Sequence, residues 1–146
     1  MQNAEDEDQY AKGREFEYFV ERMFPHSDFE ILLDPFDKGG KIPDFYIRDK
    51  KTGQKFWVEA KWRSRSYDRK YTIGKQDRLT VYRVFQEIVR PETVFMVLGF
   101  GGRPSDPSEV FCLPVDEVRY SQMFESVLRN KKHEYTSFKY ESGKLF

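Results

Sequence analysis

The chain has 146 residues, of which 38% are hydrophobic and 17% are aromatic, and its formal net charge is zero. This length predicts a single domain over residues 1–146 with one core, and the many large aromatic side chains exclude a wholly disordered protein. No apolar stretch approaches the ~20 residues of a membrane span, so we expect no membrane partner.

The cysteine content and the N-terminus indicate the compartment. Cys112 is the lone cysteine, so no internal disulfide can form. Its apolar neighbours predict a small core residue rather than a catalytic thiol, because apolar burial raises a thiol pKa. Residues 1–8 are acidic and lack the basic and apolar regions of a signal peptide. We expect residues 1–8 to be disordered and the protein to be cytoplasmic.

An amphipathic helix is predicted over residues 9–24, followed by Pro25, which ends it. Its apolar residues recur at spacings of three and four, which is typical of a helix with one face in a core. These residues are Phe16, Phe19, Val20 and Met23, with Tyr10 on or near the same stripe.

Three strands are predicted next, over residues 29–33, 43–48 and 55–62. Pro43 suits the first position of a strand, where its missing N–H matters least. The short turn over residues 49–54 predicts that the second and third strands form an antiparallel hairpin.

The third strand alternates between charged and apolar residues. Because residues two apart share a face of a strand, Glu59 and Lys61 project together, with Trp57 beside them. The opposite face, directed into a core, carries Phe56, Val58, Ala60 and Trp62. If the neighbouring strand places Asp44 beside Glu59, two carboxylates and an ammonium meet at a cleft. Such a set can hold a hard divalent cation and orient a water molecule.

The following segment is basic. An exposed, mobile loop is predicted over residues 63–73 and a helix over 75–90, which ends before Pro91. The apolar side of this helix is expected to contain Leu79, Tyr82, Val84, Phe85, Ile88 and Val89.

The remaining elements complete a mixed sheet. Residues 93–98 are almost continuously apolar, as in a central strand covered on both faces, and 110–113 form another short strand. A helix is expected over 115–128, and the tail after residue 134 is expected to form a terminal hairpin. Three meandering strands followed by a helical crossover predict an α+β fold, with helices on both sides of the sheet.

Charge is unevenly distributed along the chain. Residues 1–37 contain 3 basic and 11 acidic side chains, whereas residues 61–90 contain 9 basic and 3 acidic ones. Basic groups interleaved with aromatic residues suit a phosphate backbone, although a solvated basic face is the alternative. The candidate nucleic-acid contacts are Arg63, Arg65, Arg69, Lys70 and Lys75.

These residues resemble the motif of the PD-(D/E)XK nuclease superfamily, which has the restriction-endonuclease-like fold. The matching residues are Pro43-Asp44, Glu59-Ala60-Lys61 and, on the preceding helix, Glu17. The order of elements over residues 10–113 also matches the αβββαβ core of that fold.

The resemblance implies an enzyme that uses Mg²⁺ or Mn²⁺ to cut DNA phosphodiester bonds. Asp44, Glu59 and the backbone carbonyl of Ala60 would hold the metal. Lys61 would position or activate the attacking water, and Glu17 would reach the metal, often through a second water. Many members act in restriction, repair or recombination, and some resolve Holliday junctions as dimers. The implied partners are DNA and a second copy of the chain.

Some branches of the superfamily carry Gln and Tyr at a fixed short spacing on the helix after the catalytic strand. Gln76 occupies a suitable place, but Tyr82 is further along than that pattern requires. Gln76 is therefore a candidate contact for water or phosphate. The alternative is an ordinary polar residue in the first helical turn.

Two other interpretations stay open. The same fold without turnover would be a nucleic-acid-binding or assembly module, and an unrelated α/β domain would carry these residues by accident. In the latter, Glu59 and Lys61 would form an ordinary surface ion pair, which contributes little to stability. Zinc is disfavoured, because Cys112, His26 and His133 lack the spacing of zinc ligands.

Overall fold

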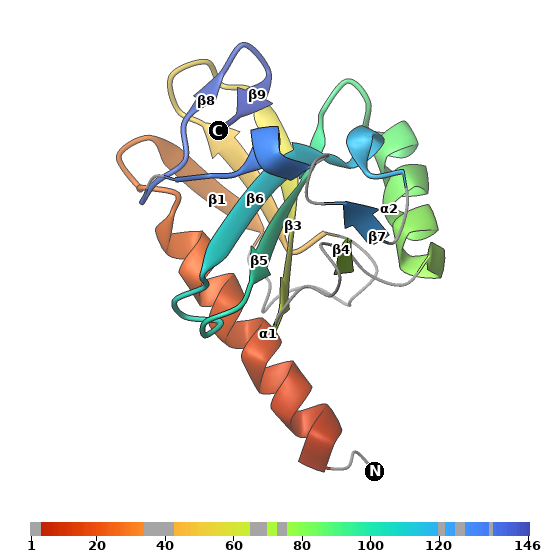
Figure 1. The fold of residues 1–146 in the computed structure, drawn as a ribbon. Coiled ribbons are helices and arrows are strands. Elements are labelled where there is room, and N and C mark those ends of the chain that lie inside the picture. Colours follow the sequence, from red (N-terminus) through yellow and green to blue (C-terminus); the bar gives the residue numbers. More distant parts are fainter. Residues whose placement is uncertain are drawn as a thin grey trace.

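A central sheet of five strands has a helix against each of its faces (Figure 1). The computed structural model describes residues 4–33, 43–64, 70–72, 76–119, 122–124, 128–134 and 136–146. Only the backbone is described for residues 4–7, 33, 70–72, 76, 77 and 122–124.

The sheet has the strand order β1-β2-β3-β5-β6. Strands β1 to β3 form an antiparallel meander, β3 and β5 are parallel, and β6 returns antiparallel to β5. The predicted mixed sheet and the predicted β2–β3 hairpin are therefore confirmed. The strands are β1 (Phe29–Leu33), β2 (Phe45–Asp49), β3 (Lys55–Arg63), β5 (Val94–Phe100) and β6 (Glu109–Pro114).

Helix α1 (Ala4–Arg22) covers one face of the sheet, and helix α2 (Gln76–Val89) covers the other (Figure 1). On the α1 side, Phe16 packs in one core with the apolar residues of β3, including Val58. On the α2 side, Tyr82 packs in a second core, against which Trp57 of β3 lies. The alternation predicted for β3 is confirmed, and Glu59 lies on the face that looks toward α2.

Close contact between α1 and the sheet depends on Gly99 of β5. A Cβ at this position would lie 2.5 Å from a ring carbon of Phe16 and 3.1 Å from a ring carbon of Trp62. Trp62 in turn donates from its Nε1 to the carbonyl of Gly101 over 3.1 Å. The missing side chain therefore lets α1 fix the end of β3 that follows Glu59.

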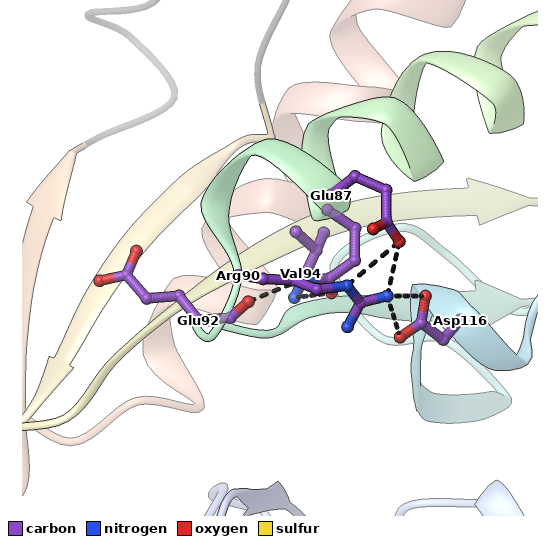
Figure 2. A network of polar contacts seen from close by, with 6 residues as sticks. Glu87, Arg90, Glu92, Val94 and Asp116 are labelled. Carbon is purple, nitrogen blue, oxygen red and sulfur yellow. Dashed lines mark hydrogen bonds and ion pairs between the residues drawn. The ribbon is translucent and has the colours of Figure 1, made fainter.

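The C-terminal end of α2 is fixed to the sheet by polar contacts. The buried Gln86 donates from Nε2 to the Glu92 carbonyl over 2.7 Å, and its Oε1 accepts from the N–H of Val94 over 2.7 Å. Figure 2 shows Arg90 between Glu87 and Asp116. Its Nη2 lies 2.7 Å from Oε1 of Glu87 and 2.9 Å from Oδ2 of Asp116. Together these contacts set the position of α2 relative to β5.

Helix α1 begins at Ala4 rather than at residue 9, so residues 4–8 are helical instead of disordered. The acidic residues that suggested disorder also suit the positive end of the helix dipole. An ion pair of 2.8 Å between Asp8 and Lys12 supports the first turns, as expected for a pair four residues apart. The N-terminal half of α1 extends beyond the sheet, and Tyr10, expected on or near the core stripe, is exposed (Figure 1).

The helix predicted over residues 115–128 is wrong. A single 3-10 turn, η1 (Val115–Glu117), is followed by strand β7 (Gln122–Phe124) and a second 3-10 turn, η2 (Arg129–Lys131). Strand β7 pairs with β4 (Lys70–Thr72), which lies far away in the sequence. A local sequence pattern cannot reveal a partner strand that lies so far away in the chain. Pairing with that strand overrides the helical propensity of the segment.

The exposed loop predicted over residues 63–73 is also partly wrong, because Arg63 ends β3 and Lys70–Thr72 forms β4. Residues 65–69 and 73–75 lie outside the described part of the chain. The predicted C-terminal hairpin is confirmed as β8 (Tyr140–Glu141) and β9 (Lys144–Leu145).

Helix α2 buries a narrower side than predicted. Val84 and Ile88 were expected in the core, but they are 54% and 73% exposed. At 100° per residue they lie on the side of the helix opposite Leu79 and Tyr82, which are buried. Cys112 is buried, as predicted. None of the described helices combines the length and apolar character needed to cross a bilayer.

Candidate active site

Asp44 and Glu59 lie side by side on the β2–β3 hairpin. Phe45 pairs with Val58 in the antiparallel register, which places the preceding Asp44 next to Glu59. The two residues are only 2% and 4% exposed, and their side chains are hydrogen-bonded to each other. The Oδ2 of Asp44 also accepts from the backbone N–H of Ala60 over 2.9 Å. The predicted meeting of the two acidic groups is confirmed, whereas their catalytic role stays a prediction.

The charges of this site perturb one another. Burial raises the pKa of Glu59 well above its ordinary value, and the neighbouring Asp44 carboxylate raises it further. Burial lowers the pKa of the Lys61 ammonium, whereas the negative charge of Glu59 opposes this change. Two acidic groups therefore share a poorly solvated space. A divalent cation there would relieve their repulsion and favour the ionised form of both.

Helix α2 contributes two residues that were not predicted to belong to the site. The Tyr82 hydroxyl hydrogen-bonds the Glu59 carboxylate, and Arg78 donates from Nη2 to the same hydroxyl over 3.3 Å. The Nζ of Lys61 lies 5.6 Å from the centroid of the Tyr82 ring. The spacing of four residues between Arg78 and Tyr82, which puts both on one side of a helix, is the signal that pairs them.

Glu17 and Ala60 have separate positions. Glu17 belongs to α1, which packs on the face of the sheet opposite Glu59, and the Nε of Arg14 lies 3.9 Å from its Oε2. The Ala60 N–H holds Asp44, so this residue takes part in the site at least through its backbone. The predicted metal contacts of Glu17 and of the Ala60 carbonyl stay predictions.

The candidate nucleic-acid contacts are only partly described. Arg63 ends β3 with a half-buried side chain, whose pKa is lowered by burial, and its Nη1 donates to the Trp62 carbonyl over 3.0 Å. Lys70 belongs to β4 and Gln76 begins α2, so both lie on elements that follow the site in the chain. The candidates outside the described residues are Arg65, Arg69 and Lys75.

The donor set fits a hard divalent cation. Within the described ranges, no group of three or more His, Cys, Asp and Glu side chains comes together. Asp44 and Glu59 therefore form a two-carboxylate set, and Mg²⁺ is usually bound by one or two carboxylates while it keeps several waters. Oxygen donors suit Mg²⁺ or Mn²⁺ better than a softer metal.

The chain matches no protein-family model and no curated protein. Among solved structures, its fold is similar to that of Hjc, a Holliday junction resolvase from the archaeal hyperthermophile Archaeoglobus fulgidus. The TM-score is 0.53, with 14% sequence identity over 84% of this chain and 93% of that chain. A likeness at this identity shows the fold alone, and it confirms the predicted restriction-endonuclease-like architecture.

Proposed function

We propose that this protein is a metal-dependent endonuclease that hydrolyses phosphodiester bonds of DNA. The observation that carries the proposal is the buried pair of Asp44 and Glu59, with Lys61 on the same face of β3. Burial of two adjacent carboxylates lowers the stability of a folded protein, so stability alone does not explain such a pair. The pair is better explained as a site that binds a cation.

Asp44 and Glu59 would hold Mg²⁺ or Mn²⁺ together with the Ala60 carbonyl, and Glu17 would reach the metal through a second water. When bound, such a metal neutralises phosphate charge and makes a bound water more acidic. Lys61 holds a positive charge where the attacking water and the anionic phosphate meet. Tyr82 keeps the Glu59 carboxylate oriented through its hydroxyl, which Arg78 supports from the next turn of α2.

DNA would be held by the basic segment that follows the site. The contacts proposed are Arg63, Arg65, Arg69, Lys70, Lys75 and Gln76. Because the net charge of the chain is zero, DNA affinity without base-specific contacts should be weak and should fall steeply as salt rises.

We also propose a homodimer and a cytoplasmic location. The outer side of α2 supports the dimer, since Val81, Val84 and Ile88 are 40%, 54% and 73% exposed and form one stripe. In a twofold pairing of antiparallel helices, the stripe of each copy would cover that of the other. The location rests on the single buried cysteine, which is typical of a reducing compartment.

A substrate panel tests the proposed activity. The parent protein is incubated with supercoiled, linear, single-stranded and four-way DNA in Mg²⁺ or Mn²⁺, and the same panel is repeated with Asp44→Ala and Lys61→Ala. Four-way DNA is included because the similar structure is that of a Holliday junction resolvase. We expect cleavage by the parent that both substitutions abolish. Binding without cleavage by the parent would instead identify a nucleic-acid-binding module.

A further inference from the structure

Two aromatic rings lie next to the acidic pair on the same face of the sheet. Tyr46 of β2 pairs with Trp57 of β3, and their rings stack with centroids 4.0 Å apart at 17°. Tyr46 follows Asp44 by two residues, and Trp57 precedes Glu59 by two. Since two residues of a strand span about 6.6 Å, the ring pair lies one such step from the carboxylates.

One carboxylate fixes both rings. The Tyr46 hydroxyl donates to Oε2 of Glu92 over 2.7 Å, and the Trp57 Nε1 donates to Oε1 of the same residue over 3.0 Å. In Figure 2, the carboxylate of Glu92 points away from Arg90, so it takes no part in the ion pairs of that arginine. Because the polar atoms of both rings are already hydrogen-bonded to Glu92, a further binding partner can contact only the apolar faces and edges of the rings.

Both rings are half-buried, but they differ in what packs against them. The ring of Phe85 meets Trp57 edge-on, with centroids 4.9 Å apart at 82°, so Trp57 is held between α2 and Tyr46. Tyr46 is the outer member of the pair and is half-buried. Its neighbours on the hairpin are cations. The Nζ of Lys55 lies over its ring, 6.0 Å from the centroid, and the Arg48 side chain is 38% exposed and has its Nη1 3.9 Å from Glu30 Oε2.

We propose that Tyr46 is a stacking platform for an unpaired DNA base next to the phosphate that is cut. The inference rests on the proposed nuclease function and names its substrate class, which is DNA with an unpaired nucleotide at the cleavage site. Aromatic rings bind single bases through their faces, without sequence preference, because every base has a π-face. Lys55, whose side chain is exposed, supplies charge for a phosphate beside that base.

A purely structural role for the ring pair makes a different prediction. Cross-strand aromatic pairs stabilise sheets in many proteins. Loss of the Tyr46 ring would then lower stability and weaken all DNA binding to the same extent. Only a stacking platform makes affinity depend on whether the DNA contains an unpaired base.

The test compares three hairpin DNAs of one sequence by fluorescence anisotropy, with Ca²⁺ as a hard cation that takes the same oxygen ligands. One is fully paired, one has a single unpaired thymine, and one has an abasic site in place of that thymine. We expect the parent and Tyr46→Phe to bind the thymine bulge roughly tenfold more tightly than the other two. Tyr46→Leu should bind all three with the same, weaker affinity.

The inference is overturned if the parent binds the thymine and abasic bulges equally, or if Tyr46→Leu keeps the preference. If Tyr46→Leu fails to fold, the thymine–abasic comparison in the parent and in Tyr46→Phe still decides. A parent that cleaves DNA without preferring the bulge contradicts this inference alone. A parent that binds none of the three DNAs contradicts the proposed function as well.

Discussion

The Asp44 carboxylate accepts a hydrogen bond from the backbone N–H of Ala60 over 2.9 Å. This bond joins the residue before β2 to the middle of β3 and keeps the carboxylate beside Glu59 instead of in water. The pKa of Glu59 is raised by its burial and by this neighbour, so the two acids repel each other when both are ionised. The hairpin therefore supports a charge arrangement that a bound cation would stabilise.

Replacement of Asp44 should separate metal binding from stability. Asp44→Asn keeps the shape of the side chain but removes one of the two crowded charges. Loss of a residue that only supports a metal ligand lowers metal affinity by up to roughly 100-fold. Because Asp44 would be a ligand itself, we expect Mn²⁺ affinity to fall by more than this. In EDTA, stability should be unchanged or higher, because like-charge repulsion is gone. Calorimetric titration and thermal unfolding measure the two effects.

Asp49→Asn is the matched control on the same hairpin. Asp49 is also buried, but its Oδ2 accepts bonds from the N–H and the hydroxyl of Thr52, at 3.0 and 2.6 Å. This substitution should cost about 1 kcal/mol of stability and leave metal affinity intact. Equal losses of affinity in both variants would show that the effect comes from folding.

Tyr82→Phe should weaken the site without disturbing the core. It removes only the hydroxyl that joins Glu59 to Arg78, while the ring stays packed. Metal affinity should fall about 10- to 100-fold, as is usual when a partner of a ligand is lost. Tyr140→Phe, the same change in the C-terminal hairpin on the other side of the sheet, should leave affinity unaltered. If the two variants bind Mn²⁺ as the parent does, Tyr82 has no part in holding Glu59.

Two glycine substitutions should change the free energy of unfolding in opposite directions. Gly99→Ala forces a methyl group against Phe16 and Trp62 and should cost about 1–3 kcal/mol, as overpacked cores do. Gly13→Ala, in α1, meets nothing within 4 Å and should stabilise by about 0.5–1 kcal/mol through helix propensity. Urea unfolding measures both. A neutral Gly99→Ala would mean that α1 and the sheet can separate without cost.

The stability of the protein should decline at high pH because of Cys112. Burial raises the pKa of its thiol to about 12, against about 8.5 in an unfolded chain. Between these values the native state keeps a proton that the unfolded state loses, so stability falls as pH rises. The slope due to this thiol approaches 1.4 kcal/mol per pH unit.

Cys112→Ala removes that contribution while the tyrosines still titrate. The difference in unfolding free energy between the parent and the variant should therefore shrink from pH 8 to pH 10. A constant difference over this range would show that Cys112 is accessible to water in the native state.

The outer stripe of α2 should decide the oligomeric state. Ile88→Glu places a charge at the most exposed residue of the proposed twofold contact, so the dimer should dissociate to a monomer in light-scattering measurements. Leu32→Glu, at another exposed apolar residue, on β1, should remain dimeric. A parent that is monomeric at high concentration, or a Leu32→Glu variant that also dissociates, argues against this interface.

Local sequence patterns predicted the acidic pair well, because strand alternation and a short hairpin fix which residues of β2 and β3 meet. Glu59 and Lys61 could be assigned to one face, and Asp44 could be placed beside them, without knowledge of the rest of the chain. The mixed character of the sheet was also predicted from the helical crossover, and β3 and β5, which α2 connects, are indeed parallel.

Features that depend on distant partners could not be predicted in the same way. Tyr82 looked like a core residue, and its ring is indeed buried, but its hydroxyl reaches Glu59 only because α2 packs over β3. The helix predicted after Pro114 fails because β7 finds a partner strand some 50 residues earlier. Val84 and Ile88 were counted as core residues although the helix turns them away from the sheet.

The anomalous scattering of a crystal soaked in Mn²⁺ tests the proposed chemistry most directly. At a pH where both acids can lose their protons, a manganese peak should appear within about 2.0–2.3 Å of the carboxylate oxygens of Asp44 and Glu59. The same soak of Asp44→Asn should show no peak. A parent crystal with no manganese between these two residues would contradict the nuclease proposal.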